Sequence, residues 1–122
     1  SFLVYKFVDG NVSFDPNIDL TTFNHIRGEP KGIQVFDVRE PHEIQTEGKF
    51  PGATNIPFGD VESAFALNDT EFEAKYGVMK PKIKDDNIVF VSKAGKEGLT
   101  ACECVRKCGY KRYKCMRFER DF

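Results

Sequence analysis

The clearest apolar runs of the chain predict buried β-strands. Residues 33–38 and 88–91 consist mainly of β-branched and aromatic residues, which is typical of strands covered on both faces. Shorter runs at residues 54–56 and 113–115 predict two further strands. Helical stretches separate these strands along the chain, so we expect a mostly parallel sheet with helices on both faces, which is an α/β fold.

The helical stretches are indicated by residues that begin and end helices. Pro41 suits a first helical turn, and Gly48, Gly77 and Gly109 are placed to end helices. The predicted helices cover residues 20–26, 41–47, 60–66, 69–76 and 96–107, and residues 118–122 are predicted to begin a last helix.

The chain length of 122 residues suits one compact domain. Residues 1–17 mix apolar and turn residues and are expected to form a short strand or arm, ahead of the main domain at residues 18–122. The chain contains no internal repeat or low-complexity tract.

Composition and charge exclude several classes of partner. The chain is 40% hydrophobic and 30% charged, as folded globular proteins are, and its net charge of −1 gives no electrostatic reason to bind nucleic acid or acidic lipid. Its apolar runs are far shorter than the roughly 20 residues that cross a bilayer. We therefore expect neither a nucleic acid nor a membrane partner, and nothing in the sequence requires a cofactor.

The four cysteines, Cys102, Cys104, Cys108 and Cys115, all lie within the last 21 residues. A disulfide framework is not distributed in this way, so we expect reduced thiols and an intracellular compartment, either cytoplasm or mitochondrion. Cys104 and Cys108 could share a helix face as metal ligands, but the sequence offers no second pair, so no metal site is predicted.

The most informative segment connects the strand at residues 88–91 to the helix at residues 96–107. Ligands of open parallel sheets bind beyond the carboxyl ends of the strands, where this connection lies. Its glycines allow successive N–H groups to converge on an anion at a helix N-terminus, although an ordinary strand-to-helix connection explains them as well. The loop consists of Ser92, Lys93, Ala94, Gly95, Lys96, Glu97 and Gly98.

Several motifs in order resemble rhodanese-like domains, and the small single-domain thiosulfate sulfurtransferases most of all. Residues 37–43 read Asp-Val-Arg-Glu-Pro-His-Glu and residues 51–57 read Pro-Gly-Ala-Thr-Asn-Ile-Pro. Residues 75–81 and the glycines of the loop continue the resemblance, which covers residues 18–122. It implies a rhodanese fold with Asp37, Arg39 and Glu43 supporting the loop, and Arg39 and Glu43 stand four apart as a candidate ion pair.

The resemblance also implies a sulfur-carrying cysteine at the start of the loop and an arginine five residues later. This chain has Ser92 and Glu97 at those positions. A serine hydroxyl cannot carry a persulfide, and an anion in place of a cation opposes thiosulfate by about 4 kcal/mol at 4 Å and an effective dielectric of about 20. We therefore expect a domain without sulfurtransferase activity that acts as a binding or structural module for a protein partner. In a sharper version, the Glu97 carboxylate turns inward and occupies the anion cradle.

Two other functions stay open. A cysteine at position 92 would imply a thiosulfate:thiol sulfurtransferase that works through a persulfide and binds a small anionic sulfur donor. Ser92 as the nucleophile of a hydrolase would need a base, for which His42 is the only candidate, although a surface histidine is the simpler interpretation.

Overall fold

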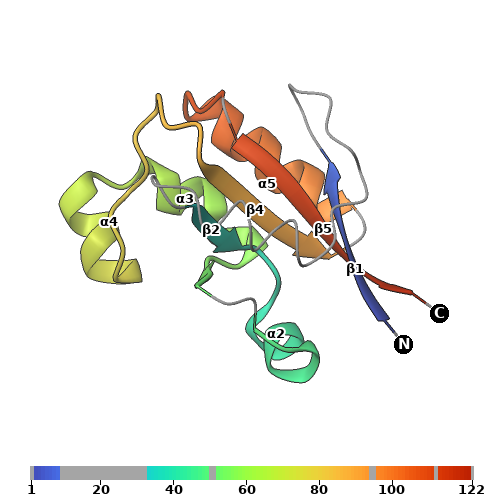
Figure 1. Ribbon diagram of the computed structural model, residues 1–122. Coiled ribbons are helices and arrows are strands. Elements are labelled where there is room, and N and C mark those ends of the chain that lie inside the picture. Colours follow the sequence, from blue (N-terminus) through green and yellow to red (C-terminus); the bar gives the residue numbers. More distant parts are fainter. Residues whose placement is uncertain (1, 9–32, 50–51, 94–95, 112, 122) are drawn as a thin grey trace.

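The computed structural model describes residues 2–8, 33–49, 52–93, 96–111 and 113–121. Their strands and helices follow one another in the alternating order of an α/β chain (Figure 1). The strands are β1 (Phe2–Val8), β2 (Gln34–Asp37), β3 (Thr54–Asn55), β4 (Ile88–Lys93) and β5 (Tyr113–Asp121). The helices are α2 (Pro41–Glu47), α3 (Val61–Ala66), α4 (Asp69–Tyr76) and α5 (Lys96–Lys107), with a 3₁₀ turn at Phe58–Asp60.

In the described part of the chain, these strands form one sheet of five in the order β1-β5-β4-β2-β3. Strands β5, β4, β2 and β3 are parallel to their neighbours, and only β1 runs antiparallel, beside β5. The prediction of a mostly parallel sheet in an α/β fold is confirmed. The carboxyl ends of four strands consequently meet at one edge of the sheet.

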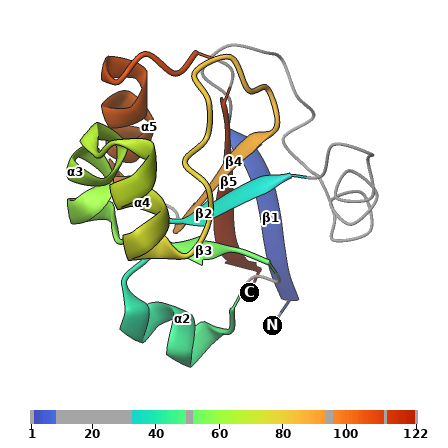
Figure 2. The ribbon, with the colours of Figure 1, turned by 90° about the vertical axis from the view of Figure 1, so that its left-hand side faces the viewer.

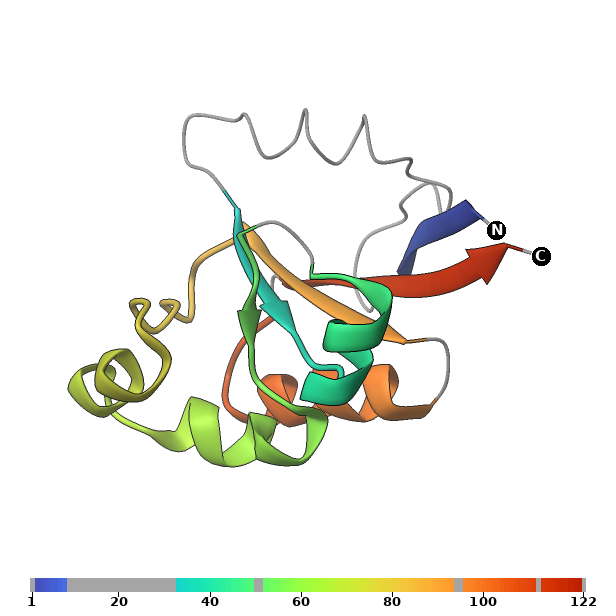
Figure 3. The same ribbon diagram turned by 90° about the horizontal axis from the view of Figure 1, so that it is seen from below.

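The helices α3, α4 and α5 lie on one side of the sheet (Figure 2). Helix α2 follows β2 and lies beyond the carboxyl end of that strand. It is nearest the viewer in Figure 3. The sequence also predicted helices on both faces, and the helix predicted over residues 20–26 lies outside the described residues. Helix α2 therefore stands at the edge where the parallel strands end.

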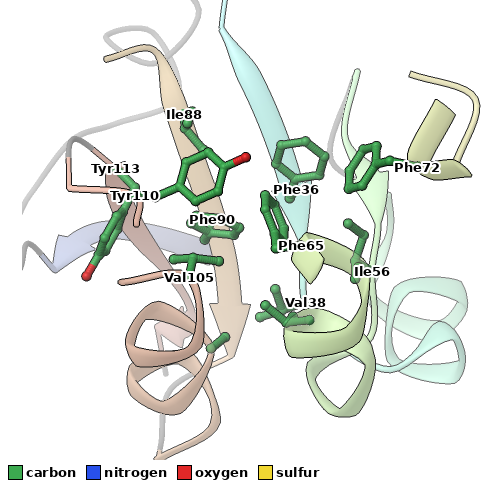
Figure 4. Close-up of a cluster of buried hydrophobic side chains, with 13 residues drawn as sticks. Phe36, Val38, Ile56, Phe65, Phe72, Ile88, Phe90, Val105, Tyr110 and Tyr113 are labelled. Atoms are coloured by element: carbon green, nitrogen blue, oxygen red, sulfur yellow. The ribbon is translucent and has the colours of Figure 1, made fainter. Parts of the chain in front are cut away.

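Aromatic side chains dominate the core between the sheet and α3 to α5 (Figure 4). Phe36 of β2 and Phe90 of β4 are paired in register, and their ring centroids are 5.8 Å apart. Phe65 of α3 packs its ring edge against Phe36 at 5.6 Å and against Tyr110 at 5.2 Å. Because side chains alternate between the faces of a strand, Ser92 follows Phe90 on the same side of β4.

The C-terminal segment corrects one prediction. Residues 118–122 were expected to begin a helix, but β5 continues from Tyr113 to Asp121. Strand β1 supplies the missing partner for this segment, with Tyr5 opposite Phe118 and Phe2 opposite Asp121. The strand predicted at residues 113–115 is therefore confirmed and longer than expected, and residues 2–8 belong to the same sheet.

The helix signals between residues 41 and 107 were confirmed. Helices α2, α4 and α5 have the predicted bounds, and α3 begins at Val61 after the 3₁₀ turn. Gly77 ends α4 in the left-handed conformation at φ 76°, and Gly109 follows α5 at φ 99°. A side chain at either position would be strained, which explains why glycine marks these ends.

Candidate functional site

Ser92 lies near the carboxyl end of β4 and is only 6% exposed. The neighbouring Val91 is paired with Asp37 of β2, and the backbone N–H of Val38 donates to the Val91 carbonyl at 2.8 Å. The segment after β2 and the loop after β4 therefore begin side by side, although more than 50 residues separate them in the sequence. The structure brings together the two motifs that carried the sequence prediction.

Asp37 and Arg39 form a buried ion pair at this edge, and each residue is 1% exposed. The Arg39 Nη2 atom lies 2.7 Å from Asp37 Oδ2, and Arg39 Nε lies 3.0 Å from Asp37 Oδ1. Arg39 Nη2 also donates to the Gly48 carbonyl at 3.2 Å, at the end of α2. This pair thereby ties the end of β2 to the C-terminal end of α2.

The predicted pairing of Arg39 with Glu43 is wrong as a helical interaction. Helix α2 begins at Pro41, so Arg39 lies before the helix and the spacing of four residues has no helical meaning there. Glu43 instead accepts a hydrogen bond from the backbone N–H of Glu40 at 3.2 Å and closes the first turn of α2.

Asn55 is a supporting residue that the candidate set from the sequence did not include. Its Nδ2 donates to the Asp37 carbonyl at 2.8 Å and to the Arg39 carbonyl at 2.9 Å. The side chain thereby links β3 to the turn after β2. The available signal was the Asn-Ile-Pro sequence of the second motif, in which an amide side chain directly precedes the apolar Ile56.

Lys93, the last residue of β4, is held by two carboxylates of α2. Its Nζ lies 3.2 Å from Glu47 Oε1 and 3.3 Å from Glu43 Oε2. The hydrogen bond to Glu47 is the largest cause that raises the pKa of Lys93, followed by the hydrogen bond to Glu43. Burial acts to raise the pKa of Glu43, but its hydrogen bonds with Glu40 and Lys93 outweigh burial and lower that pKa. Both shifts favour the charged forms of Lys93 and Glu43.

Glu47, which pairs with Lys93, also approaches the buried pair of Asp37 and Arg39. Glu47 Oε2 lies 3.8 Å from Arg39 Nη1, and the Glu47 side chain is 12% exposed. Alternating charges thus run from Asp37 through Arg39, Glu47 and Lys93 to Glu43. This network joins the start of the loop to α2 and to the end of β2.

A small open cavity of about 210 Å³ lies between α2 and β3. Its lining is Asp37, Pro41, Ile44, Lys49, Ala53 and Asn55. Asp37 and Asn55 already have hydrogen-bond partners in the turn. The rest of the lining is apolar except for Lys49. The cavity borders the turn after β2 that Asn55 supports.

The rest of the predicted loop is described only in part. Ala94 and Gly95 lie outside the described residues, and Lys96, Glu97 and Gly98 are described only as the first backbone turn of α5. The anion cradle and the inward position of Glu97 therefore stay predictions.

The alternative of a serine hydrolase gains no support from the described contacts. His42 is an exposed residue of α2, and no hydrogen bond joins its side chain to Ser92 in the described part of the chain. A hydroxyl without a base is a poor nucleophile at neutral pH.

The described cysteines are ordinary helix thiols. Cys104 on α5 and Cys108, directly after the helix, are free and partly buried, and burial is the largest cause that raises the pKa of Cys104. A raised pKa lowers the thiolate fraction and hence the reactivity. Within the described ranges, no three histidine, cysteine or acidic side chains stand close enough to hold a metal ion. The same ranges contain no helix that is long and apolar enough to cross a membrane.

Comparison with known proteins identifies relatives in sequence and in structure. The family model of the rhodanese-like domain matches residues 22–117. The chain is 42% identical over 77 residues to a human thiosulfate:glutathione sulfurtransferase, a match that covers 63% of this chain and 66% of the relative. It is 38% identical over 81 residues to a putative mitochondrial thiosulfate sulfurtransferase of Schizosaccharomyces pombe, covering 66% of this chain and 56% of the relative. The matched segment thus spans less than two thirds of either relative's length.

Solved structures give the same result. A human single-domain sulfurtransferase superposes with a TM-score of 0.69 at 33% identity, over 84% of this chain and 88% of that one. A single-domain sulfurtransferase of Saccharomyces cerevisiae superposes with a TM-score of 0.59 at 26% identity, over 75% of this chain and 73% of that one.

Proposed function

We propose, on the premise that this chain belongs to the rhodanese-like domain family, that it acts as a binding or structural module and does not transfer sulfur. The observation that carries the proposal is Ser92 at the end of β4, 6% exposed and adjacent to the buried Asp37–Arg39 turn. The resemblance assigns the sulfur-carrying cysteine to this position.

The chemistry of Ser92 supports the loss of activity. Sulfur transfer of the rhodanese type requires a thiolate that attacks the donor and holds the sulfur as a persulfide. A hydroxyl is far less acidic than a thiol and forms no persulfide. Among the described cysteines, Cys104 lies on α5 and Cys108 directly after it, and both are partly buried. They offer no substitute for a thiol at the end of β4.

Glu97 supports the proposal through its charge. It stands where the resemblance assigns a donor-binding arginine, so it repels an anionic sulfur donor instead of attracting one. Its backbone belongs to the first turn of α5. In our proposal its carboxylate accepts hydrogen bonds from the N–H groups of the loop and occupies the place of the donor.

The retained framework supports a role in binding. The Asp37–Arg39 pair and the Asn55 bridge keep the turn after β2 in place. A domain that keeps such a framework without its reactive group suits recognition of a protein partner. In our proposal both proteins lie in an intracellular, reducing compartment, where the cysteines of this chain stay as thiols.

The names of the relatives favour a second function. Proteins named thiosulfate sulfurtransferases are 38–42% identical to this chain over its matched segment. If the working protein had cysteine at position 92, transfer of sulfur from thiosulfate to a thiol would be the better assignment.

An assay of thiosulfate sulfurtransferase activity separates these functions. The chain is compared with its Ser92→Cys variant and with its Ser92→Cys/Glu97→Arg variant, with cyanide and glutathione as alternative acceptors. We expect no transfer by the chain itself, and transfer only after both substitutions. Turnover by the unsubstituted chain would overturn the proposal. Circular dichroism and the urea midpoint of each variant establish that inactivity does not reflect unfolding.

A further inference from the structure

The connector between α4 and β4, residues 77–87, carries exposed apolar side chains. Among the residues whose side chains the structure describes, three large hydrophobic ones are exposed, and all three belong to this connector. They are Val78 at 37%, Met79 at 69% and Ile83 at 57%. Even a fully extended backbone keeps the Cα atoms of these residues within about 18 Å, so one peptide segment can contact all three. Clustered apolar surface of this kind marks contacts with another molecule.

Hydrogen bonds fix the connector to the rest of the domain. Lys80 Nζ donates to the backbone carbonyl that follows α3 at 2.8 Å, and the Tyr110 hydroxyl donates to the carbonyl of the buried Pro81. The backbone N–H of Lys82 donates to the Asp85 carboxylate at 2.9 Å, and the N–H of Asp85 donates to the Lys82 carbonyl at the same distance. A partner therefore meets a backbone that is already in place, which lowers the entropy cost of association.

Lysines accompany these apolar side chains. Residues 75–84 contain four lysines and no acidic residue, whereas the whole chain has 19 acidic residues against 18 basic ones. Lys80 is used within the domain, and the other three lysines are exposed: Lys75, Lys82 and Lys84. These three lysines, together with Val78, Met79 and Ile83, form what we call the connector surface. The connector surface is both apolar and locally positive.

The connector surface lies far from Ser92. The connector enters β4 at Ile88, whereas Ser92 stands near the carboxyl end of the same strand. Figure 2 shows the connector at the end of the molecule opposite α2. Binding at this surface can consequently be measured separately from the chemistry at position 92.

We propose that the connector surface binds a protein partner through a segment that combines acidic with large apolar side chains. The lysines attract the acidic residues and select the partner, while the exposed apolar side chains pack against those of the segment. Met79 suits this role because its flexible thioether adapts to different partner shapes. The inference rests on the proposed function in one respect, which is that this domain acts by binding a protein.

A lipid surface fits the connector less well than a peptide segment does. Side chains that insert at a membrane interface are typically carried by an amphipathic helix with a long apolar face. Residues 77–87 are not helical, and their apolar side chains are few. The charge and the shape together favour a short acidic segment.

A peptide-display selection on the full chain tests the inference. Random peptides are selected on the immobilised chain, with an excess of Met79→Ser/Ile83→Ser in solution as competitor, so that only peptides that need the connector surface are retained. We expect the retained peptides to combine aspartate or glutamate with large apolar residues. Retained peptides that are basic or lack apolar residues, or a selection that retains no peptide, would overturn the inference.

The affinity of the most frequent retained peptide is then measured by fluorescence anisotropy. Lys84→Glu should weaken binding about tenfold at low ionic strength, which is the effect of reversing one charge about 6 Å from an acidic residue in water. Lys49→Glu is the matched control, because Lys49 is an exposed lysine beyond α2, and it should change the affinity by less than about twofold. Equal losses in these two variants would contradict the proposal.

Sedimentation with vesicles of phosphatidylcholine and phosphatidylserine tests the other class of partner. We expect the chain to stay in solution, and vesicle binding that Met79→Ser/Ile83→Ser abolishes would assign the surface to a membrane instead. Urea midpoints of all variants show whether each variant is folded. The proposed function fails by a different result, which is sulfur transfer by the unsubstituted chain.

Discussion

Replacement of Arg39 by methionine tests the framework of the site most sharply. The substitution keeps an unbranched side chain of similar length but removes the guanidinium group. Arg39 donates to the Asp37 carboxylate through Nε at 3.0 and 3.1 Å and through Nη2 at 2.7 Å. Without these bonds, the carboxylate of Asp37 loses its cation, although Asp37 is only 1% exposed.

The magnitude follows from this burial. Removal of one partner from a buried ion pair costs about 3–5 kcal/mol, mainly because the remaining charge stays desolvated. For a chain of 122 residues, the unfolding entropy near 60 °C is about 0.26 kcal/mol/K, so the melting temperature should fall by about 12–20 °C. An exposed ion pair would give a loss below about 1 kcal/mol.

The assay is urea denaturation followed by circular dichroism, with thermal melting as a second measurement. Lys84→Met is the matched control, because Lys84 is exposed and its substitution should change the unfolding free energy by less than about 0.5 kcal/mol. Asp37→Asn/Arg39→Met should be more stable than the sum of the two single losses predicts, because it also removes the unpaired carboxylate. A loss below about 1 kcal/mol for Arg39→Met, or strict additivity of the two substitutions, would refute the reasoning.

Two further substitutions test other supports of the fold. Asn55→Ala should lower the unfolding free energy by about 1–3 kcal/mol in urea denaturation, because two backbone carbonyl groups lose their donor; Asn55→Asp should not restore the loss, and full stability of Asn55→Ala would contradict the bridge. Tyr110 donates its hydroxyl to the Pro81 carbonyl, and burial is the largest cause that raises its pKa to about 12. Because this pKa lies above the value of about 10 in the unfolded chain, the stabilisation is complete below about pH 10 and is lost as the pH rises toward 12. Unfolding free energies measured across this window should fall less steeply for Tyr110→Phe than for the original chain, and parallel curves would refute the assignment.

The sequence predicted the parts of the fold that depend on neighbouring residues. Residues 88–91 carry their own strand signal, and Gly109 marks the end of the helix at residues 96–107. Strand β5 was only partly foreseen because its length depends on pairing with β1, at the other end of the chain. Local patterns contain no information about a partner more than 100 residues away.

The site shows the same division. Asp37 and Arg39 were predicted as supporting residues, but the helical spacing expected for Arg39 and Glu43 does not apply, because α2 begins only at Pro41. The contact between Glu47 and Lys93 joins residues 46 positions apart, and it forms only because α2 lies beside the end of β4. Spacing along one helix reveals which carboxylates share a face, but it does not reveal which cation they meet.

The most direct test of the central claim is the mass of the chain after incubation with thiosulfate, with the modified residue located by peptide mapping. The account predicts that the original chain gains no sulfur atom in its loop peptide, whereas Ser92→Cys/Glu97→Arg gains one sulfur atom on the residue introduced at position 92. The added sulfur should disappear when cyanide is supplied as acceptor. A loop peptide of the original chain that carries transferable sulfur would contradict the account.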